Sequence, residues 1–359
     1  MNEFIFVHLG KSIPKYLESN LERTHKLFPN TKITLICDNP EFKSEFVNIS
    51  LYKQSESTKE VFSKSHLDRN FRSGFWVKSL ERLIAVFEYQ IKNQVQKLIH
   101  IESDVLLMPN FPLDTLGELT MPTWTKYSDS KSVGAVVCIP SYKHAEQLLQ
   151  STLSSIKKNT KITDMTLLHE LSETVKIAET FSHDILNSHR PLHKLKDKTE
   201  RIDLREGFFD PAQIGMWLTG EDPRNHLGMN VIHSNELFEL GESEINPAEL
   251  LYSIDSEHNL WAKNTSGTEF PIWSLHIHSK NKKLFGKNDS SGLLKFIQKS
   301  QDLSIKRSLN VWILCRLIFD NLKNRTLMAY TKSALRYLLS ISDKNSYFLT
   351  AMRKRNEDI

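Results

Sequence analysis

The chain has 359 residues, of which 39% are hydrophobic and 25% charged, with a formal net charge of +4. This balance is typical of a globular protein with a buried core and excludes a disordered, fibrous or repetitive chain. No run of about 18 apolar residues occurs, and the first residues enter a short apolar segment at once, so we expect a cytoplasmic protein. The three cysteines lie far apart in apolar sequence, which indicates reduced core thiols at Cys37, Cys138 and Cys315.

The first elements predict a parallel α/β sheet. Residues 4–9 are an apolar run rich in strand formers, residues 14–28 place apolar side chains on one helical face, and residues 32–38 form a second strand pattern. Ligands of such sheets bind beyond the carboxyl ends of the strands. His8 and Asp38 stand at those ends and are therefore candidate ligand contacts.

The remainder of the pattern alternates helices and strands up to a basic tail. We expect helices over 73–93, 142–158 and 164–181, strands over 97–104, 132–139 and 271–279, a helix that starts at Asp210, and helices from about 289 to the end. This order predicts one α/β domain over residues 1–286 and a helical region over residues 287–359.

Positive charge is concentrated in the tail. Residues 277–359 hold 17 Lys and Arg against 6 Asp and Glu, whereas the rest of the chain holds 30 against 37. Within the tail, residues 308–322 are apolar on most sides but include Arg316, which favours a packed helix over a helix lying in a membrane surface. Peripheral contact with the inner face of the membrane stays open, and no groove-reading motif points to nucleic acid.

Two acids lie at the carboxyl end of the strand predicted over 97–104. Side chains alternate across a strand, so Glu102 and Asp104 point the same way and Ser103 points the opposite way. Two carboxylates on one face suit Mg²⁺ or Mn²⁺, with a diphosphate supplying further ligands. An isolated pair of this kind is more often the polar end of a strand.

A second set of candidate ligands lies late in the chain. His276 and His278 share one face of the predicted strand, and Lys280, Lys282 and Lys283 follow. A neutral imidazole can complete a metal shell, and ammonium groups match the charge of a diphosphate. A core histidine is the competing interpretation.

Two further segments carry candidates with a structural alternative. Asp210 is predicted to cap a helix, and a carboxylate held there can also contact an acceptor hydroxyl or act as a base. Residues 69–82 mix cations with aromatic residues, so Trp76 and Arg82 are candidate contacts to a sugar, base or phosphate. A Phe-Trp pair at a helix start is more often part of the core.

Several segments, in this order, resemble the GT-A class of glycosyltransferases of bacterial and viral surface-glycan synthesis. They are "FVHLG", a strand ending in "CD", "SLERL", "HIESDVLL", "FDPAQIGMWLTGEDPRN" and "LHIHSK", and the resemblance covers residues 4–285. It implies that the D-x-D position binds a divalent metal and a nucleotide-sugar diphosphate, that a late His completes the metal shell, that His8 and Asp38 contact base and ribose, and that Lys280 lies near the phosphates. Here the first acid of the motif is Glu102, which leaves Asp104 as the more secure ligand.

The resemblance predicts a metal-dependent enzyme that transfers a hexosyl or deoxyhexosyl group from a nucleotide sugar to a glycan or lipid-linked glycan. An inverting enzyme needs a carboxylate base, for which Asp210 comes first and Asp164 and Glu170 next. Asp164 also suits a helix start, and Glu170 also suits the solvated face of a helix. A sugar-phosphate nucleotidyltransferase is an alternative that lacks its Gly-rich loop here, and a non-catalytic nucleotide- or glycan-binding protein is another.

Overall fold

The computed structural model describes residues 2–10, 12–69, 74–181, 207–220, 222, 247, 250–285, 292–295 and 297. The predicted helical region 287–359, including Arg316 and Cys315, lies outside the described residues apart from 292–295 and 297. Within the described part, Cys37 and Cys138 are buried free thiols, as predicted. No helix among the described residues is long and apolar enough to cross a membrane.

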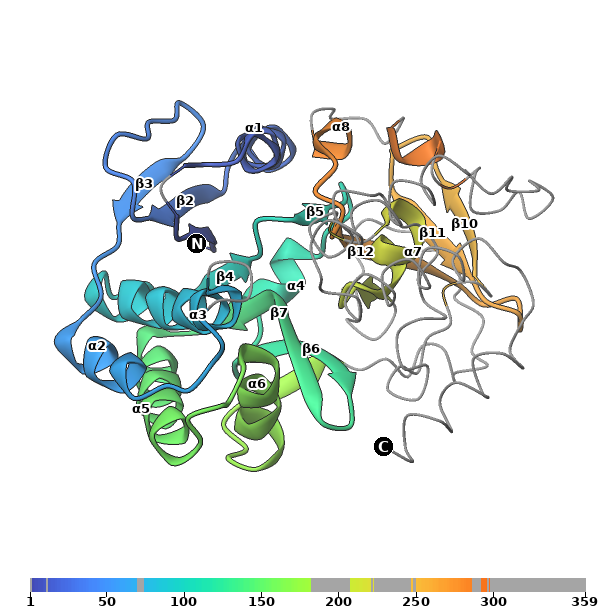
Figure 1. Ribbon diagram of the computed structural model, residues 1–359. Coiled ribbons are helices and arrows are strands. Elements are labelled where there is room, and N and C mark those ends of the chain that lie inside the picture. Colours follow the sequence, from blue (N-terminus) through green and yellow to red (C-terminus); the bar gives the residue numbers. More distant parts are fainter. Residues whose placement is uncertain are drawn as a thin grey trace, which may run out of the picture.

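A seven-stranded sheet forms the larger part of the molecule (Figure 1). Its strand order is β3-β2-β1-β4-β7-β6-β8, and four of its six strand pairs are parallel. The strands are β1 (Glu3–His8), β2 (Lys32–Cys37), β3 (Asn48–Leu51), β4 (Leu98–Ile101), β6 (Thr123–Ser128), β7 (Lys131–Ile139) and β8 (Glu179–Phe181). The central strands are almost continuously buried because helices cover both faces of the sheet.

The helices form two layers around this sheet. On one face lie α2 (Glu56–Ser63), α3 (Phe75–Lys92), α5 (Tyr142–Lys158) and α6 (Asp164–Glu173), and on the other lie α1 (Lys15–Leu27) and α4 (Leu113–Gly117). Each helix buries an apolar stripe in the core on its own side, as Leu17 and Leu21 of α1 do. The predicted α/β fold, with a mostly parallel sheet flanked by helices, is confirmed.

A smaller sheet is attached at the carboxyl end of β4. It contains β10 (Leu251–Ile254), β11 (Leu260–Lys263), β12 (Glu269–His276) and β5 (Val105–Leu107) in that order, with β9 (Phe208–Phe209) paired to β12. Two short helices, α7 (Gln213–Thr219) and α8 (Lys282–Phe285), accompany it. The chain leaves the large sheet after Ile101 and enters the small one at Val105, so Glu102, Ser103 and Asp104 form the turn between the two sheets (Figure 1).

Some predicted boundaries are wrong. The helix expected over 164–181 ends at Glu173, and residues 179–181 form strand β8, because Lys176 adopts a left-handed backbone (φ 55°) that no helix continues. The segment between β2 and α3, for which no element was predicted, contains β3 and α2. His276 is the last residue of β12, so His278 lies beyond the strand. The two histidines therefore do not share one face of a strand, contrary to the prediction.

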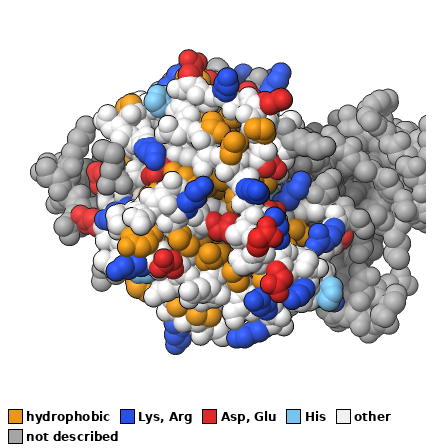
Figure 2. Space-filling model, turned by 90° about the vertical axis from the view of Figure 1, so that its left-hand side faces the viewer, with side chains coloured by type: hydrophobic (Ala, Val, Ile, Leu, Met, Phe, Trp, Pro, Cys, Tyr) orange, Lys and Arg blue, Asp and Glu red, His pale blue; other side chains and the backbone are white. Residues whose placement is uncertain are grey.

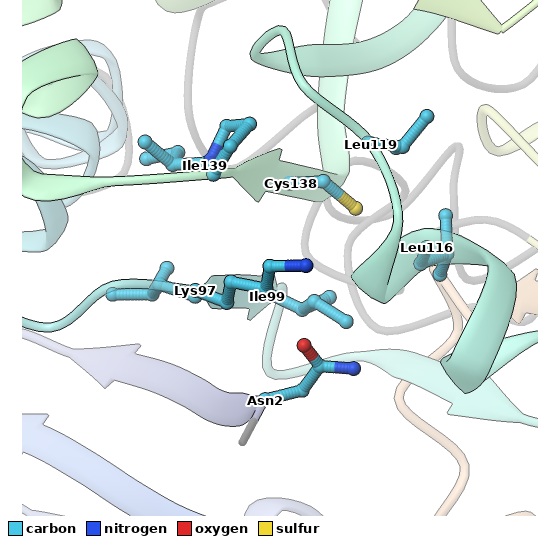
Figure 3. Close-up of a pocket in the computed structure, with 9 residues that line it drawn as sticks. Asn2, Lys97, Ile99, Leu116, Leu119, Cys138 and Ile139 are labelled. Atoms are coloured by element: carbon cyan, nitrogen blue, oxygen red, sulfur yellow. The ribbon is translucent and has the colours of Figure 1, made fainter.

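Two further features are the surface on one side of the molecule and a small cavity near the ends of β4 and β7. On the face shown in Figure 2, charged side chains of both signs alternate with small hydrophobic areas, and neither sign forms a continuous patch. A cavity between the amino end of β4 and the carboxyl end of β7 is lined by Asn2, Lys97, Cys138 and neighbours (Figure 3). Its volume of about 10 Å³ holds at most one water, so it is no substrate site.

Candidate functional site

The acid turn, residues 102–104, is buried and held by backbone hydrogen bonds. The backbone N–H of Glu102 donates to the Ala135 carbonyl (3.0 Å), and that of Val105 donates to the Glu102 carbonyl (3.0 Å). Glu102, Ser103 and Asp104 are each 6–7% exposed. The two carboxylates face His276, whereas the Ser103 hydroxyl lies 3.2 Å from the Tyr16 hydroxyl of α1. The predicted opposition of Ser103 to the two acids is thus present.

Helix α1 fixes the backbone around the acid turn through a polar face that is buried. The amide of Asn20 donates to the carbonyls of Ser103 (3.2 Å) and Val105 (2.8 Å), and the guanidinium of Arg23 donates to the carbonyl of Leu107 (2.5 Å). Burial lowers the pKa of Arg23 to about 10. Asn20 is fully buried. These groups leave the turn little freedom, which positions both carboxylates.

Three side chains bring metal-ligating atoms together. One donor atom each from Glu102, Asp104 and His276 lies within 4.8 Å of the other two. Nε2 of His276 is 3.2 Å from Oε2 of Glu102 and 3.4 Å from Oδ1 of Asp104. Two carboxylates and an imidazole are a donor set that Mn²⁺ accepts readily and Mg²⁺ accepts in part, so the residues present fit a divalent cation. His278 is outside this group, but its ring centroid is 4.5 Å from that of His276.

Cations surround the acids. Nη2 of Arg82 is 2.6 Å from Oε1 of Glu102, and Nζ of Lys280 is 2.8 Å from Oδ2 of Asp104. Burial by itself would raise the pKa of Asp104, but Lys280 and His276 outweigh it and hold that pKa well below its ordinary range. Asp104 is therefore ionised at neutral pH, as a metal ligand must be.

The histidines differ in their electrostatic surroundings. Burial opposes the charged form of His276, yet Asp104 and Glu102 raise its pKa above the ordinary value. Burial, with His276 and Lys280 nearby, lowers the pKa of His278 well below that value. Nδ1 of His276 is buried without a hydrogen-bond partner among the described residues, while Nε2 faces the acids.

His8 and Asp38 lie together at the carboxyl ends of β1 and β2. His8 pairs in register with Cys37, the last residue of the neighbouring strand β2, and Asp38 follows directly after that strand. The Asp38 carboxylate accepts from the backbone N–H of Gly10 (2.8 Å), and Nε2 of His8 lies 3.0 Å from the Ser12 carbonyl. Burial lowers the pKa of His8, which keeps the imidazole neutral at pH 7. Their role as base and ribose contacts stays a prediction.

Trp76 packs against the core at the start of a helix, which is the structural alternative to a ligand contact. It lies in the first turn of α3, partly buried against the core on that face of the sheet, and its ring meets that of Phe75 edge to face at 5.0 Å. A sugar or nucleotide contact for Trp76 stays a prediction that these packing contacts do not favour.

Asp210 is a structural anchor. Helix α7 begins at Gln213, later than predicted, and the Asp210 carboxylate accepts from the backbone N–H groups of Ala212 (3.1 Å), Ile214 (2.9 Å) and Gly215 (2.7 Å). It also accepts from the backbone N–H of His276 (3.0 Å) and has no exposed surface. Four donors satisfy the carboxylate and link α7 to β12. The predicted N-cap position is wrong, because Ala212 is the N-cap residue of α7, but the Asp210 carboxylate does accept from the first N–H groups of that helix. The role as base stays a prediction without a contact in its favour.

The two remaining carboxylates have different neighbours. Oδ2 of Asp164, at the start of α6, is 3.9 Å from Nη2 of Arg82, which also contacts Glu102. Burial raises the pKa of Asp164 to about 6, against the opposing effect of Arg82. Glu170 instead accepts a hydrogen bond from Ser155 (2.6 Å), which joins α6 to α5. Asp164 therefore belongs to the charged network, whereas the hydrogen bond of Glu170 holds two helices together.

Sequence reasoning missed three contributors to the site. Tyr16 and Asn20 contact the acid turn from α1, and Asp222 lies 3.2 Å from Nζ of Lys280. One signal was present: Tyr16, Asn20 and Arg23 are spaced four and three residues apart, so they share a helical face that also borders the buried Leu17 and Leu21. Asp222 follows a Gly-Glu pair in a loop, where no local pattern marks it.

Comparison with solved structures finds glycosyltransferases at low similarity. The galactosyltransferase LgtC in complex with donor and acceptor sugar analogs has a TM-score of 0.41 and 12% identity, over 87% of this chain and 99% of that chain. An active-site mutant of LgtC gives 0.36 and 12% over 60% and 89%. The apo-form glycosyltransferase GlyE of Streptococcus pneumoniae TIGR4 gives 0.34 and 13% over 51% and 45%. No family model matches the sequence, and no curated protein is similar to it. At these TM-scores the likeness assigns neither site residues nor a reaction to this chain.

Proposed function

We propose that this chain is a metal-dependent glycosyltransferase that moves a sugar from a nucleotide-sugar donor to a glycan or lipid-linked glycan in surface polysaccharide synthesis. The observation that carries the proposal is the buried group of Glu102, Asp104 and His276 with Lys280 beside it. This group lies at the carboxyl end of β4, on the edge of the sheet where ligands of α/β proteins bind. Hard ligands for a divalent cation and an ammonium group can together neutralise the charge of a diphosphate leaving group.

Each side chain has a proposed task. Asp104, Glu102 and His276 would hold Mn²⁺ or Mg²⁺, which when bound neutralises charge on the leaving diphosphate. Lys280 supplies a second positive charge to that diphosphate, since its ammonium lies next to Asp104. Arg82 orients Glu102 through its 2.6 Å ion pair. His8 and Asp38 are the proposed contacts to base and ribose at the neighbouring strand ends.

Asp164 is the proposed base among the three candidate carboxylates. A general base works best when its pKa lies near the working pH, and burial raises the pKa of Asp164 to about 6. Asp210 and Glu170 have structural partners instead. Asp164 is also within 3.9 Å of Arg82, whose other contact is the acid turn.

The experiment is a thermal-shift screen of UDP, GDP, dTDP and CMP sugars with and without Mn²⁺, followed by donor hydrolysis with the sugar that stabilises most. We expect Mn²⁺-dependent stabilisation by one donor, and loss of hydrolysis in Asp104→Asn. Ser103→Ala is the matched control, because it changes the next residue of the same turn without removing a carboxylate. Full hydrolysis by Asp104→Asn, or no shift with any donor, contradicts the proposal.

A non-catalytic nucleotide- or glycan-binding protein is the second candidate. One observation favours it: Oε1 of Glu102 is already engaged by Arg82, so a single oxygen of this carboxylate faces His276. Such a protein would bind a donor or glycan with no hydrolysis in the presence of Mn²⁺. Contact with the inner face of the membrane through residues 287–359 stays a prediction, tested by flotation of the full chain with anionic vesicles.

A further inference from the structure

The ammonium group of Lys280 lies between two buried carboxylates. Its Nζ is 2.8 Å from Oδ2 of Asp104 and 3.2 Å from Oδ2 of Asp222. An ammonium group has three N–H donors, so it serves both oxygens at once. Asp222 is 2% exposed and comes from the loop after α7, whereas Asp104 belongs to the turn between the sheets. Lys280 thus joins two parts of the chain that are distant in sequence.

The backbone of Lys280 is itself unusual. Its φ of 51° lies in the left-handed region, which a residue with a long side chain seldom adopts, and its N–H donates to the Ile277 carbonyl (3.0 Å). This tight turn directs the side chain back toward the acid turn. A costly backbone conformation persists only where surrounding contacts maintain it, and the two carboxylates are such contacts.

A divalent cation and the ammonium group act on the same carboxylate. A bound divalent ion is the largest charge in its site, and Lys280 already neutralises Asp104. The closer the Lys280 ammonium group lies to the Asp104 carboxylate, the more weakly that carboxylate binds a metal. A second anion beside Lys280 reduces this competition, since the ammonium can shift toward it while remaining within the site.

We propose that Asp222 is a positioning residue that draws Lys280 away from Asp104 when a divalent cation binds and holds it ready for the donor diphosphate. The proposal rests on the metal site of the proposed function. It assigns Lys280 two partners used in turn: Asp104, which competes with the metal, and Asp222, which relieves that competition.

The test measures Mn²⁺ affinity of the full chain without any nucleotide sugar, by calorimetry and by the electron paramagnetic resonance signal of free Mn²⁺. We expect Lys280→Met to bind Mn²⁺ about tenfold more tightly than wild type, equivalent to about 1.4 kcal/mol, because the competing charge is gone. We expect Asp222→Asn to bind it about tenfold more weakly. Lys263→Met, at an exposed lysine on β11, is the matched control and should leave the affinity unchanged.

The double variant separates sharing of Lys280 from a simple through-space effect of Asp222. If Asp222 acts through Lys280, the loss caused by Asp222→Asn largely disappears in the Lys280→Met background. An equal loss in both backgrounds overturns the proposal, as does an unchanged affinity in Lys280→Met. Should Asp222→Asn fail to fold, Asp222→Ser takes its place in the same comparison of the two Lys280 backgrounds, so that a variant of Asp222 still decides. Absence of Mn²⁺ binding by wild type refutes the metal site itself, a different outcome from binding that is indifferent to Lys280.

Discussion

Replacing Asn20 by alanine tests whether α1 holds the acid turn in place. The Asn20 amide is fully buried and donates to two backbone carbonyls, those of Ser103 and Val105. Each such hydrogen bond contributes about 0.5–1.5 kcal/mol net, and truncation also leaves a small cavity. We therefore expect Asn20→Ala to lower the free energy of unfolding by about 2–4 kcal/mol, which for a chain of 359 residues corresponds to a fall in Tm of about 3–5 °C.

The assay is thermal unfolding followed by circular dichroism, with Mn²⁺ affinity measured at a temperature where both proteins are folded. The control is Asn93→Ala, because the Asn93 amide makes a single exposed hydrogen bond, to the Tyr89 carbonyl (2.9 Å). An exposed change of this kind shifts stability by no more than about 0.5 kcal/mol. Mn²⁺ affinity should fall in Asn20→Ala, since the carboxylates lose their fixed spacing. A fall in Tm equal to that of the control would refute the role of α1.

Four further predictions test the site by substitution. His276→Gln should weaken Mn²⁺ binding at least about tenfold. His278→Gln should weaken it by a smaller factor, because only His276 lies in the three-donor group. Equal losses of affinity in a Mn²⁺ titration of the two variants would contradict this. The transfer rate should rise with pH through about 6, because a base with this raised pKa is protonated and inactive at lower pH. Asp164→Asn should remove that rise and slow transfer by about 100-fold or more. A variant with an unchanged pH profile would exclude Asp164 as the base. Asp210→Asn should cost about 3 kcal/mol by denaturant unfolding, since an amide cannot accept from four N–H groups; normal stability with lost turnover would instead restore the base role. Gly215→Ala should cost about 1–3 kcal/mol or more and reduce Mn²⁺ affinity, because the new Cβ would lie 1.9 Å from the His276 carbonyl oxygen; a variant with wild-type Tm would show that α7 adjusts freely.

Local pattern predicted much of the large sheet correctly. The strand and helix patterns of residues 4–38 and the helix over 142–158 correspond to β1, α1, β2 and α5. Periodicity is enough there because these elements bury one stripe or both faces against a common core. It failed after Glu173, where a left-handed Lys176 ends α6, and between β2 and α3, where short, partly exposed elements carry a weak pattern.

The candidate ligands were readable from residue type, but their roles were not. Glu102 and Asp104 were identified from spacing, as were His276 and His278 together, and Lys280 from the cluster of lysines that follows them. Local pattern predicted that Asp210 accepts from the start of a helix, but nothing local indicated that it also accepts from the backbone N–H of His276. This contact depends on an element far away in the chain, as does the choice of His276 over His278 for the three-donor group.

By itself the sequence determined that this protein has an α/β fold and which acids and imidazoles were available for a site. Tertiary structure alone decided which of them meet. β12 pairs with β5 in the register that sets His276 opposite Val105, next to Asp104, and the loop after α7 brings Asp222 to Lys280. The physical reason is that burial periodicity is a property of single elements, whereas ligand geometry arises from strand pairing and loop placement between distant segments.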